Sequence, residues 1–238
     1  MRRLVIATPV GDAGVQLDLA PGASKVLVLG HGAGGSVDAP DLVAVRDACL
    51  SAGISVARVT QPYRLAGKKA PPAAATLDAG WAAVVASLGR RKALAGLEFV
   101  YAGRSSGARV ACRAAVDGAV SPRAAAVVAL AFPVAPPGKP EKSRLDELDA
   151  VGVPVLVVQG DRDPFGMPEP RPEDEIHAVR LVCEVPGDHS LKRDPATVGE
   201  LVAGWLSALP PQRAHTRTRW QPVSLGDKSG RAVPECQP

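Results

Sequence analysis

The chain of 238 residues is poor in cysteine, methionine and aromatic residues. Its four cysteines, Cys49, Cys112, Cys183 and Cys236, form no C-x-x-C pair and have no histidine at zinc-ligand spacing. This pattern argues against a zinc-binding module. We therefore expect reduced, structurally inert thiols and no metal site.

Long apolar runs are also absent. No run reaches the roughly 18 residues of a membrane-spanning helix. The first segment, MRRLVIATPVGD, lacks the long apolar core of a signal peptide. We therefore expect a soluble, cytoplasmic protein with no membrane partner.

The charge of the chain is small and unevenly distributed. The formal net charge is +4, and residues 211–238 contribute most of it, with five basic and two acidic side chains. The nearly neutral remainder gives no electrostatic reason to expect a nucleic-acid partner. After Pro210 the composition shifts to proline, glycine, arginine and threonine without periodicity. We therefore predict one folded domain over residues 1–210 and a flexible basic tail over 211–238.

Apolar runs alternate with helical segments along most of the chain. Buried strands are predicted at 25–30, 54–59, 97–102, 124–131, 153–159 and 180–185. Helices are predicted at 40–52, 71–88, 107–119, 143–150 and 195–209. Two alternating segments, 2–7 and 14–19, predict an antiparallel hairpin with its turn at Gly11 to Gly14. The fold class is therefore α/β, with a mostly parallel, doubly wound sheet and helices on both faces. The proline-rich stretch 132–142 is too short to form a helical cap domain, so any cleft should be open.

The segment Gly103-Arg104-Ser105-Ser106-Gly107 lies between a predicted strand and a predicted helix. A serine in such a tight strand-to-helix turn points its hydroxyl away from the sheet, and the glycines let neighbouring backbone approach. This arrangement is a nucleophile elbow, and Ser105 is its candidate nucleophile.

Two further strand ends carry groups that a serine nucleophile needs. A hydroxyl requires a base, and the base requires a carboxylate that fixes its tautomer. His189 follows the strand at 180–185, and Asp163 follows the strand at 153–159. Asp161 competes with Asp163 for the carboxylate position. Parallel strands end at one edge of a sheet, so we expect Ser105, His189 and Asp163 to meet there.

The developing oxyanion of an acyl-transfer reaction needs preorganised N–H donors. The residue after the nucleophile, Ser106, supplies one candidate backbone donor. The loop His31-Gly32-Ala33-Gly34-Gly35 after the strand at 25–30 supplies the second, at Ala33 or at Gly34. His31 itself is expected to order this loop by hydrogen bonding.

Other polar residues near the same edge are less specific. Tyr63 and Arg64 follow the strand at 54–59 and are candidates for binding an anionic or extended substrate, or belong to a solvated loop. Arg104 could pair with a carboxylate near the site, which the sequence does not identify.

Four segments, HGAGG, GRSSG, GDRDPFG and GDHS, together with QPYR at 61–64, resemble the α/β-hydrolase superfamily over roughly residues 25–209. The resemblance is to its small, cap-poor branch related to dienelactone hydrolase, which includes testis-expressed hydrolase-like and NSL-complex hydrolase-like proteins. It implies an eight-strand-type sheet and a serine nucleophile in place of the cysteine of dienelactone hydrolase. It does not imply a substrate, and some members of this branch serve as complex subunits.

A dinucleotide site is the main alternative for the glycine loop. Gly30-x-Gly32-x-x-Gly35 fits the fingerprint, and Arg58 at the next strand end could meet a phosphate. That fingerprint needs a helix that begins within the glycines, whereas Pro40 marks a later helix start. We therefore expect no cofactor.

The sequence predicts a serine hydrolase with the triad Ser105, His189 and Asp163, acting on a small ester, thioester or related acyl substrate. The alternative is a non-catalytic binding or scaffold protein on the same fold. A His189 ring beyond hydrogen-bond reach of Ser105 and Asp163 would favour that alternative.

Overall fold

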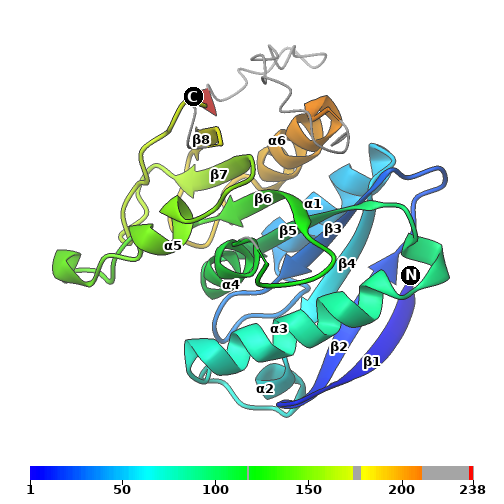
Figure 1. Cartoon of the computed structure of the whole chain (residues 1–238). Helices are drawn as coiled ribbons and strands as arrows, with labels where there is room; N and C mark the ends of the chain where they lie inside the picture. Colours follow the sequence, from blue (N-terminus) through cyan, green and yellow to red (C-terminus); the bar gives the residue numbers. More distant parts are fainter. Residues whose placement is uncertain (117, 174–177, 211–235, 238) are drawn as a thin grey trace.

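A computed structural model describes residues 1–116, 118–173, 178–210 and 236–237 (Figure 1). These residues form a nine-stranded sheet in the order β1-β2-β4-β3-β5-β6-β7-β8-β9. The strands are β1 (Arg2–Thr8), β2 (Gly11–Asp18), β3 (Lys25–Gly30), β4 (Ser55–Thr60), β5 (Glu98–Arg104), β6 (Ala124–Leu130), β7 (Val155–Gly160), β8 (Arg180–Val185) and β9 (Cys236–Gln237). From β4 to β8 all neighbours pair in parallel, while β1 with β2, β2 with β4, and β8 with β9 are antiparallel.

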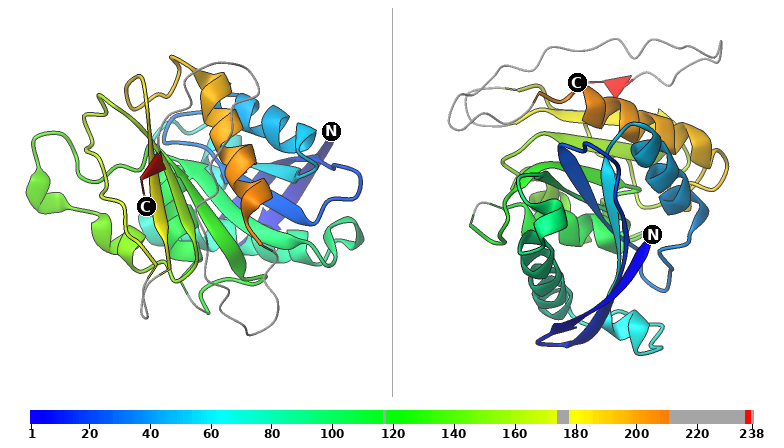
Figure 2. Two further views of the ribbon diagram at one scale, coloured as in Figure 1. Left: turned by 90° about the horizontal axis from the view of Figure 1, so that it is seen from above. Right: turned by 90° about the vertical axis from the view of Figure 1, so that its right-hand side faces the viewer.

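Two helix layers cover the sheet. The helices are α1 (Pro40–Ser51), α2 (Pro62–Leu65), α3 (Ala74–Gly89), α4 (Ser106–Ala114), α5 (Leu145–Asp149) and α6 (Pro195–Ala208), with 3-10 turns η1 (Lys92–Leu94) and η2 (Pro140–Lys142). The apolar sides of α1 and α6 share one buried cluster with one face of the sheet, and those of α3, α4 and α5 share a second cluster with the other face. Figure 2 shows these two layers on opposite sides of the sheet. The predicted doubly wound α/β fold is confirmed.

The predicted strands follow the observed ones closely, because the core strands are mostly apolar and largely buried on both faces. The predictions for 25–30 and 180–185 coincide with β3 and β8, and the other core strands differ at either end by at most two residues. The predicted position of the hairpin turn, Gly11 to Gly14, is wrong. The turn lies at Pro9 and Val10, since Thr8 pairs with Gly11 and β2 continues through Gly14.

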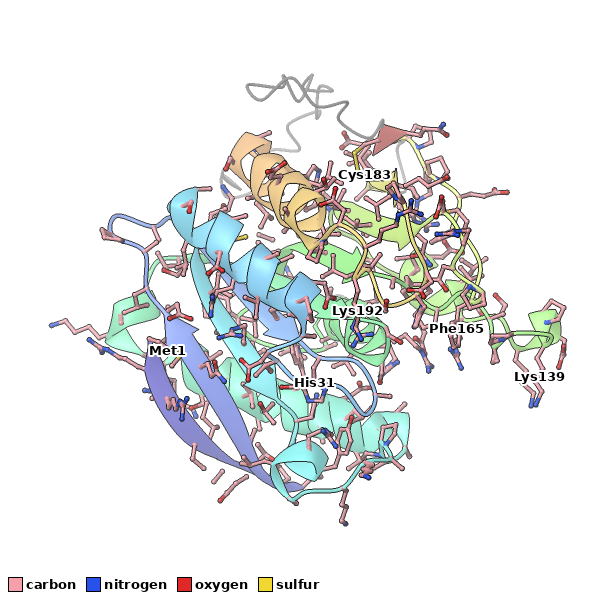
Figure 3. All side chains as sticks on the ribbon, turned by 180° about the vertical axis from the view of Figure 1, so that it is seen from behind. Met1, His31, Lys139, Phe165, Cys183 and Lys192 are labelled. Atoms are coloured by element: carbon pink, nitrogen blue, oxygen red, sulfur yellow. A yellow bond between two sulfur atoms is a disulfide. The ribbon has the colours of Figure 1, made fainter. Side chains whose placement is uncertain are left out.

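The expectation of four reduced cysteines is wrong for one pair. Cys183 in β8 and Cys236 in β9 lie opposite each other in the antiparallel register and form a disulfide (Figure 3). The spacing of 53 residues gives no sign of this, because the pairing of the two strands brings the residues together. Cys49 and Cys112 are free and buried. Burial raises the pKa of each of these two thiols to about 12, which makes them unreactive.

The connection between β6 and β7 holds only η2 and α5, in keeping with the prediction of no cap domain. None of the helices among the described residues is long and apolar enough to cross a bilayer. Most of the segment predicted as a basic tail, 211–235 and residue 238, lies outside the described residues, and the described part of it is β9.

Candidate active site

Ser105 occupies a sharp turn between β5 and α4. Its backbone has φ 54° and ψ −113°, a conformation that non-glycine residues rarely adopt. The Ser105 N–H donates to Leu130 O at 2.9 Å, and Ser105 O accepts from Arg109 N at 3.2 Å. The turn is therefore tied to β6 on one side and to the first turn of α4 on the other.

The two glycines of the elbow allow the backbones to pack closely. A Cβ atom on Gly103 would lie 2.3 Å from the carbonyl carbon of Gly107. A Cβ atom on Gly107 would lie 2.7 Å from His31 O. All of these neighbours are backbone atoms that cannot rotate away. The pattern Gly-x-Ser-x-Gly is thus required here by the contact of α4 with β5 and β3.

The His189 ring bridges Ser105 and Asp163. Its Nε2 lies 2.7 Å from Ser105 Oγ, and its Nδ1 lies 2.8 Å from Asp163 Oδ2. The Asp163 side chain is only 1 % exposed, against 19 % for His189. With a proton on Nδ1, the ring donates to the buried carboxylate and Nε2 accepts from the serine hydroxyl. The structure therefore brings together the three side chains that the strand ends predicted.

Asp161, the competing carboxylate, lies elsewhere. Its Oδ1 accepts from Gly187 N at 2.7 Å, and this hydrogen bond is the main cause that lowers the pKa of its exposed carboxyl group. Asp188 accepts from the N–H and the hydroxyl of Ser190, a turn role. Of the aspartates that follow β7 and β8, Asp163 is the one that contacts His189.

Two residues that the sequence did not single out hold Asp163 and His189 in place. Gln159, fully buried at the end of β7, donates from Nε2 to Asp163 Oδ2 at 2.8 Å and to the carbonyl oxygens of Phe132 and Gly166. Phe165 donates its N–H to Asp163 Oδ1 at 2.9 Å, and its ring centroid lies 4.2 Å from that of His189. A polar residue at the end of an otherwise apolar strand was the available signal for Gln159.

The glycine loop is anchored by His31. The buried ring lies 2.8 Å from Gly32 O through Nδ1, and its Nε2 accepts from Gln61 N at 3.1 Å. Burial lowers the pKa of His31, which keeps the ring neutral. His31 thus orders the loop, as expected, and joins it to the segment after β4.

Within this loop, Gly35 N donates to Gly32 O at 3.0 Å, and Gly34 has φ +66°. This is a tight turn with Ala33 and Gly34 at its centre, and such a turn does not use the N–H of its first central residue. Ser106 is the first residue of α4, where helix N–H groups have no acceptor within the helix. The turn does not use the N–H group of Ala33, and the helix does not use that of Ser106. Both predicted oxyanion donors are therefore left free by the elements to which they belong.

Arg104 pairs with Asp41, the carboxylate that the sequence could not identify. Arg104 Nε lies 3.6 Å from Asp41 Oδ2, and Asp41 is fully buried in the first turn of α1. Burial raises the pKa of Asp41, and the charge of Arg104 opposes this shift. Cβ atoms placed on Gly32 and Gly35 would lie 3.2 Å from the Arg104 guanidinium. The guanidinium therefore packs directly against the glycine loop.

The two candidate substrate-binding residues differ. Arg64 uses Nε on Gly35 O and Nη1 on Lys68 O, both at 3.0 Å, so its guanidinium braces the glycine loop. Tyr63 is buried, which raises the pKa of its phenol, and its ring lies 6.0 Å from that of His31. Tyr63 also lines a pocket.

The residues that suggested a dinucleotide site have other roles. Residues 31–39 separate β3 from α1, which begins at Pro40. Arg58 is only 1 % exposed and donates to Val37 O, Asp38 Oδ1 and Gln16 Oε1. Within the described ranges, no three His, Cys, Asp or Glu side chains are placed to hold a metal ion.

Comparison with solved structures gives several α/β hydrolases at low sequence identity. A serine hydrolase homologue from Coxiella burnetii has a TM-score of 0.67 and 18% identity, covering 86% of this chain and 97% of that one. A dienelactone hydrolase from Anabaena variabilis has a TM-score of 0.66 and 18% identity, covering 86% and 95%. A serine hydrolase without a lid from Xanthomonas campestris has a TM-score of 0.61 and 24% identity, covering 88% and 96%.

No curated protein matches the chain in a sequence search. A family model described as "Alpha/beta hydrolase domain" matches residues 23–203. That range begins just before β3, ends within α6 and contains the elbow, the glycine loop and the His189 loop. The chain therefore belongs to the alpha/beta hydrolase domain family.

Proposed function

We propose that the protein is a serine hydrolase that cleaves a small ester, thioester or related acyl compound through an acyl-enzyme. The observation that carries the proposal is the His189 ring, within 2.8 Å of both Ser105 Oγ and Asp163 Oδ2. The strained conformation of Ser105 adds to it, because such backbone strain is retained where a site needs it.

In the first step, Ser105 Oγ attacks the carbonyl carbon of the substrate while His189 Nε2 takes the hydroxyl proton. Asp163 holds the Nδ1–H and stabilises the imidazolium that results. The bond between the carbonyl carbon and the leaving group then breaks. The leaving group departs with the proton from Nε2, and Ser105 carries the acyl group as an ester.

In the second step, a water molecule replaces the leaving group. His189 Nε2 takes a proton from the water as its oxygen attacks the acyl carbon, and returns that proton to Ser105 Oγ when the ester bond breaks. In both steps the carbonyl oxygen becomes negative. The N–H groups of Ser106 and Ala33 are the proposed donors, and loss of one such donor typically costs about 3 kcal/mol.

The structural neighbours support this reaction class. Besides the hydrolases above, Est1E from Butyrivibrio proteoclasticus, which was also solved with ferulic acid bound, matches with a TM-score of 0.65 and 16% identity over 87% of this chain. The cap-poor architecture supports placing the chain in the branch related to dienelactone hydrolase, with serine as nucleophile. The alternative is a non-catalytic scaffold, which would be expected if the His189 ring lay beyond hydrogen-bond reach of Ser105 and Asp163. The distances of 2.7 Å to Ser105 Oγ and 2.8 Å to Asp163 Oδ2 argue against this alternative.

A fluorophosphonate probe tests the proposal, because it reacts with activated serines. Wild-type protein should be labelled and should hydrolyse p-nitrophenyl acetate, whereas Ser105→Ala should do neither. Ser106→Ala is the matched control, since it keeps the backbone N–H and should retain substantial activity. Equal labelling of Ser105→Ala and wild type would refute the assignment of the nucleophile. Comparable losses in Ser105→Ala and Ser106→Ala would show that the elbow has been misinterpreted.

A further inference from the structure

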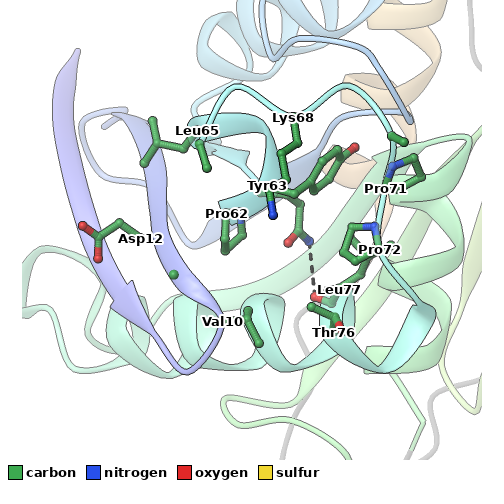
Figure 4. Close-up of a pocket in the computed structure, with 14 residues that line it drawn as sticks. Val10, Asp12, Pro62, Tyr63, Leu65, Lys68, Pro71, Pro72, Thr76 and Leu77 are labelled. Carbon is green, nitrogen blue, oxygen red and sulfur yellow. Dashed lines mark hydrogen bonds between the residues drawn. The ribbon is translucent and has the colours of Figure 1, made fainter.

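A pocket of about 660 Å³ lies at the carboxyl edge of the sheet, beside the glycine loop (Figure 4). It is bounded by the tip of the β1–β2 hairpin, by the segment that follows β4 and by the first turn of α3. Tyr63 forms part of its wall and also contacts the glycine loop, through a hydrogen bond with the Gly34 backbone. The pocket therefore adjoins the loop proposed to hold the carbonyl oxygen.

Most of the residues that line this pocket are apolar. The aliphatic and proline side chains that line it are Val10, Pro62, Leu65, Ala66, Ala70, Pro71, Pro72 and Leu77. Gln61 is a polar residue of the lining. Its Nε2 donates to Leu77 O, while its Oε1 is buried against α3 at Gly80 and has no hydrogen-bond partner among the described residues. The charged residues of the lining are one acid, Asp12, and one base, Lys68, so their charges cancel. Such a pocket suits a neutral hydrocarbon group, because its two charges have opposite signs and give no net attraction for an ion.

The pocket lies two strands away from Ser105. The order β4-β3-β5 places the pocket segment after β4, the glycine loop after β3 and Ser105 after β5. Neighbouring strands are about 4.8 Å apart, so the pocket segment begins roughly 10 Å from the nucleophile. A substrate that reacts at Ser105 needs an extended group to occupy it.

The position of His189 decides which end of the substrate this group belongs to. The leaving oxygen must lie within reach of His189 Nε2, which protonates it. His189 approaches Ser105 from the β8 side of the sheet, whereas the pocket lies on the β4 side. The leaving group therefore lies toward β8, and the acyl group extends the other way, past Tyr63.

We propose that this pocket binds the acyl chain of the substrate, and that the protein prefers esters of medium-length, unbranched aliphatic acids over acetate esters. The inference rests on the proposed function, since it assumes acyl transfer to Ser105. Tyr63 acts in it as part of the wall over which the chain passes.

A bulky side chain in the pocket provides the test. Thr76 lines the pocket from the first turn of α3, and Ala75, its exposed neighbour on the same helix, does not. Wild-type protein should show a higher kcat/KM for p-nitrophenyl octanoate than for p-nitrophenyl acetate. Thr76→Trp should lower the ratio of these two values by at least about tenfold, because chain methylenes lose their site. Ala75→Trp should leave the ratio at the wild-type value.

A ratio that is the same in wild type, Thr76→Trp and Ala75→Trp would overturn the proposal. Isothermal titration calorimetry of octanamide binding to Ser105→Ala separates this inference from the hydrolase proposal, because a binding measurement needs no catalytic turnover. If Ser105→Ala binds octanamide and the double variant with Thr76→Trp does not, the pocket proposal is supported. If no ester is hydrolysed in that case, the hydrolase proposal alone fails. Absence of octanamide binding together with an unchanged ratio overturns the pocket and leaves the hydrolase proposal standing.

Discussion

Gln159 should act as a positioning residue for the Asp163 carboxylate. We predict that Gln159→Met, which keeps the length of the side chain but removes its hydrogen bonds, lowers kcat without a matching change in KM. The wild-type amide donates to Asp163 Oδ2 at 2.8 Å, to Gly166 O at 2.8 Å and to Phe132 O at 3.0 Å. Its replacement removes this donor from the two carbonyl oxygens and, among the contacts of the described residues, leaves His189 as the partner of Oδ2.

The size of each effect follows from these contacts. Nε2 carries two hydrogens for these three acceptors, so the variant loses about two hydrogen bonds, one of them to a charged carboxylate. A neutral hydrogen bond contributes about 1 kcal/mol and a bond to a charged group about 2 kcal/mol, so the free energy of unfolding should fall by about 3 kcal/mol. Asp163 would keep its bond from Phe165 N but could rotate about it. Because misplacement by about 1 Å can cost about 100-fold, we expect kcat to fall roughly 10- to 100-fold.

Val157→Ala is the matched control for this prediction. Val157 lies two residues before Gln159 on the same face of β7 and is equally buried, but it belongs to the apolar cluster. Its truncation should cost about 2 kcal/mol of stability. Steady-state kinetics with p-nitrophenyl acetate, and urea denaturation for stability, separate the two effects. If Gln159→Met loses no more kcat than Val157→Ala, the loss reflects stability alone and the positioning role is refuted.

Two further predictions concern stability. Burial lowers the pKa of His31 below 6.5. As the pH falls through 6.5, His31 therefore becomes protonated in the unfolded chain but stays neutral in the folded one. The free energy of unfolding should therefore decrease as the pH falls below about 6.5, by up to about 1.4 kcal/mol per pH unit. Urea denaturation at several pH values should show a smaller slope for His31→Gln, and equal slopes would contradict the assignment. Reduction of the bond between Cys183 and Cys236, which closes a separation of 53 residues, should cost about 4 kcal/mol in the chain-entropy account. A reductant should then destabilise wild type but not Cys236→Ser, and equal responses would contradict the pairing.

The sequence predicted the elements whose signal is local. Core strands such as β3 and β6 are continuous apolar runs, and the elbow at Ser105 is a short pattern with a backbone reason for each glycine. The strand ends could then be assigned to one edge, because parallel strands share a direction. The order of the strand ends alone therefore predicted that His189 and Asp163 lie beside Ser105.

The features that the sequence did not predict depend on pairings between distant segments. Gln159 ends an apolar strand, and only the approach of Phe132 and Gly166 shows why an amide is needed there. Cys236 pairs with Cys183 because β9 adds to the sheet edge beside β8. The hairpin turn is a different case, since Pro9 was a local turn signal that the glycines at 11 and 14 obscured.

The precision of the elbow depends on how α4 is held. A helix of nine residues has little stability of its own. Two bidentate ion pairs fix it to its neighbours, Arg109 with Glu147 of α5 and Arg113 with Asp78 of α3. Such partly exposed pairs contribute little to the free energy of folding, but their planar geometry restricts orientation. Because α4 begins directly after Ser105, restricting its orientation holds the strained serine at the distance from His189 that proton transfer requires.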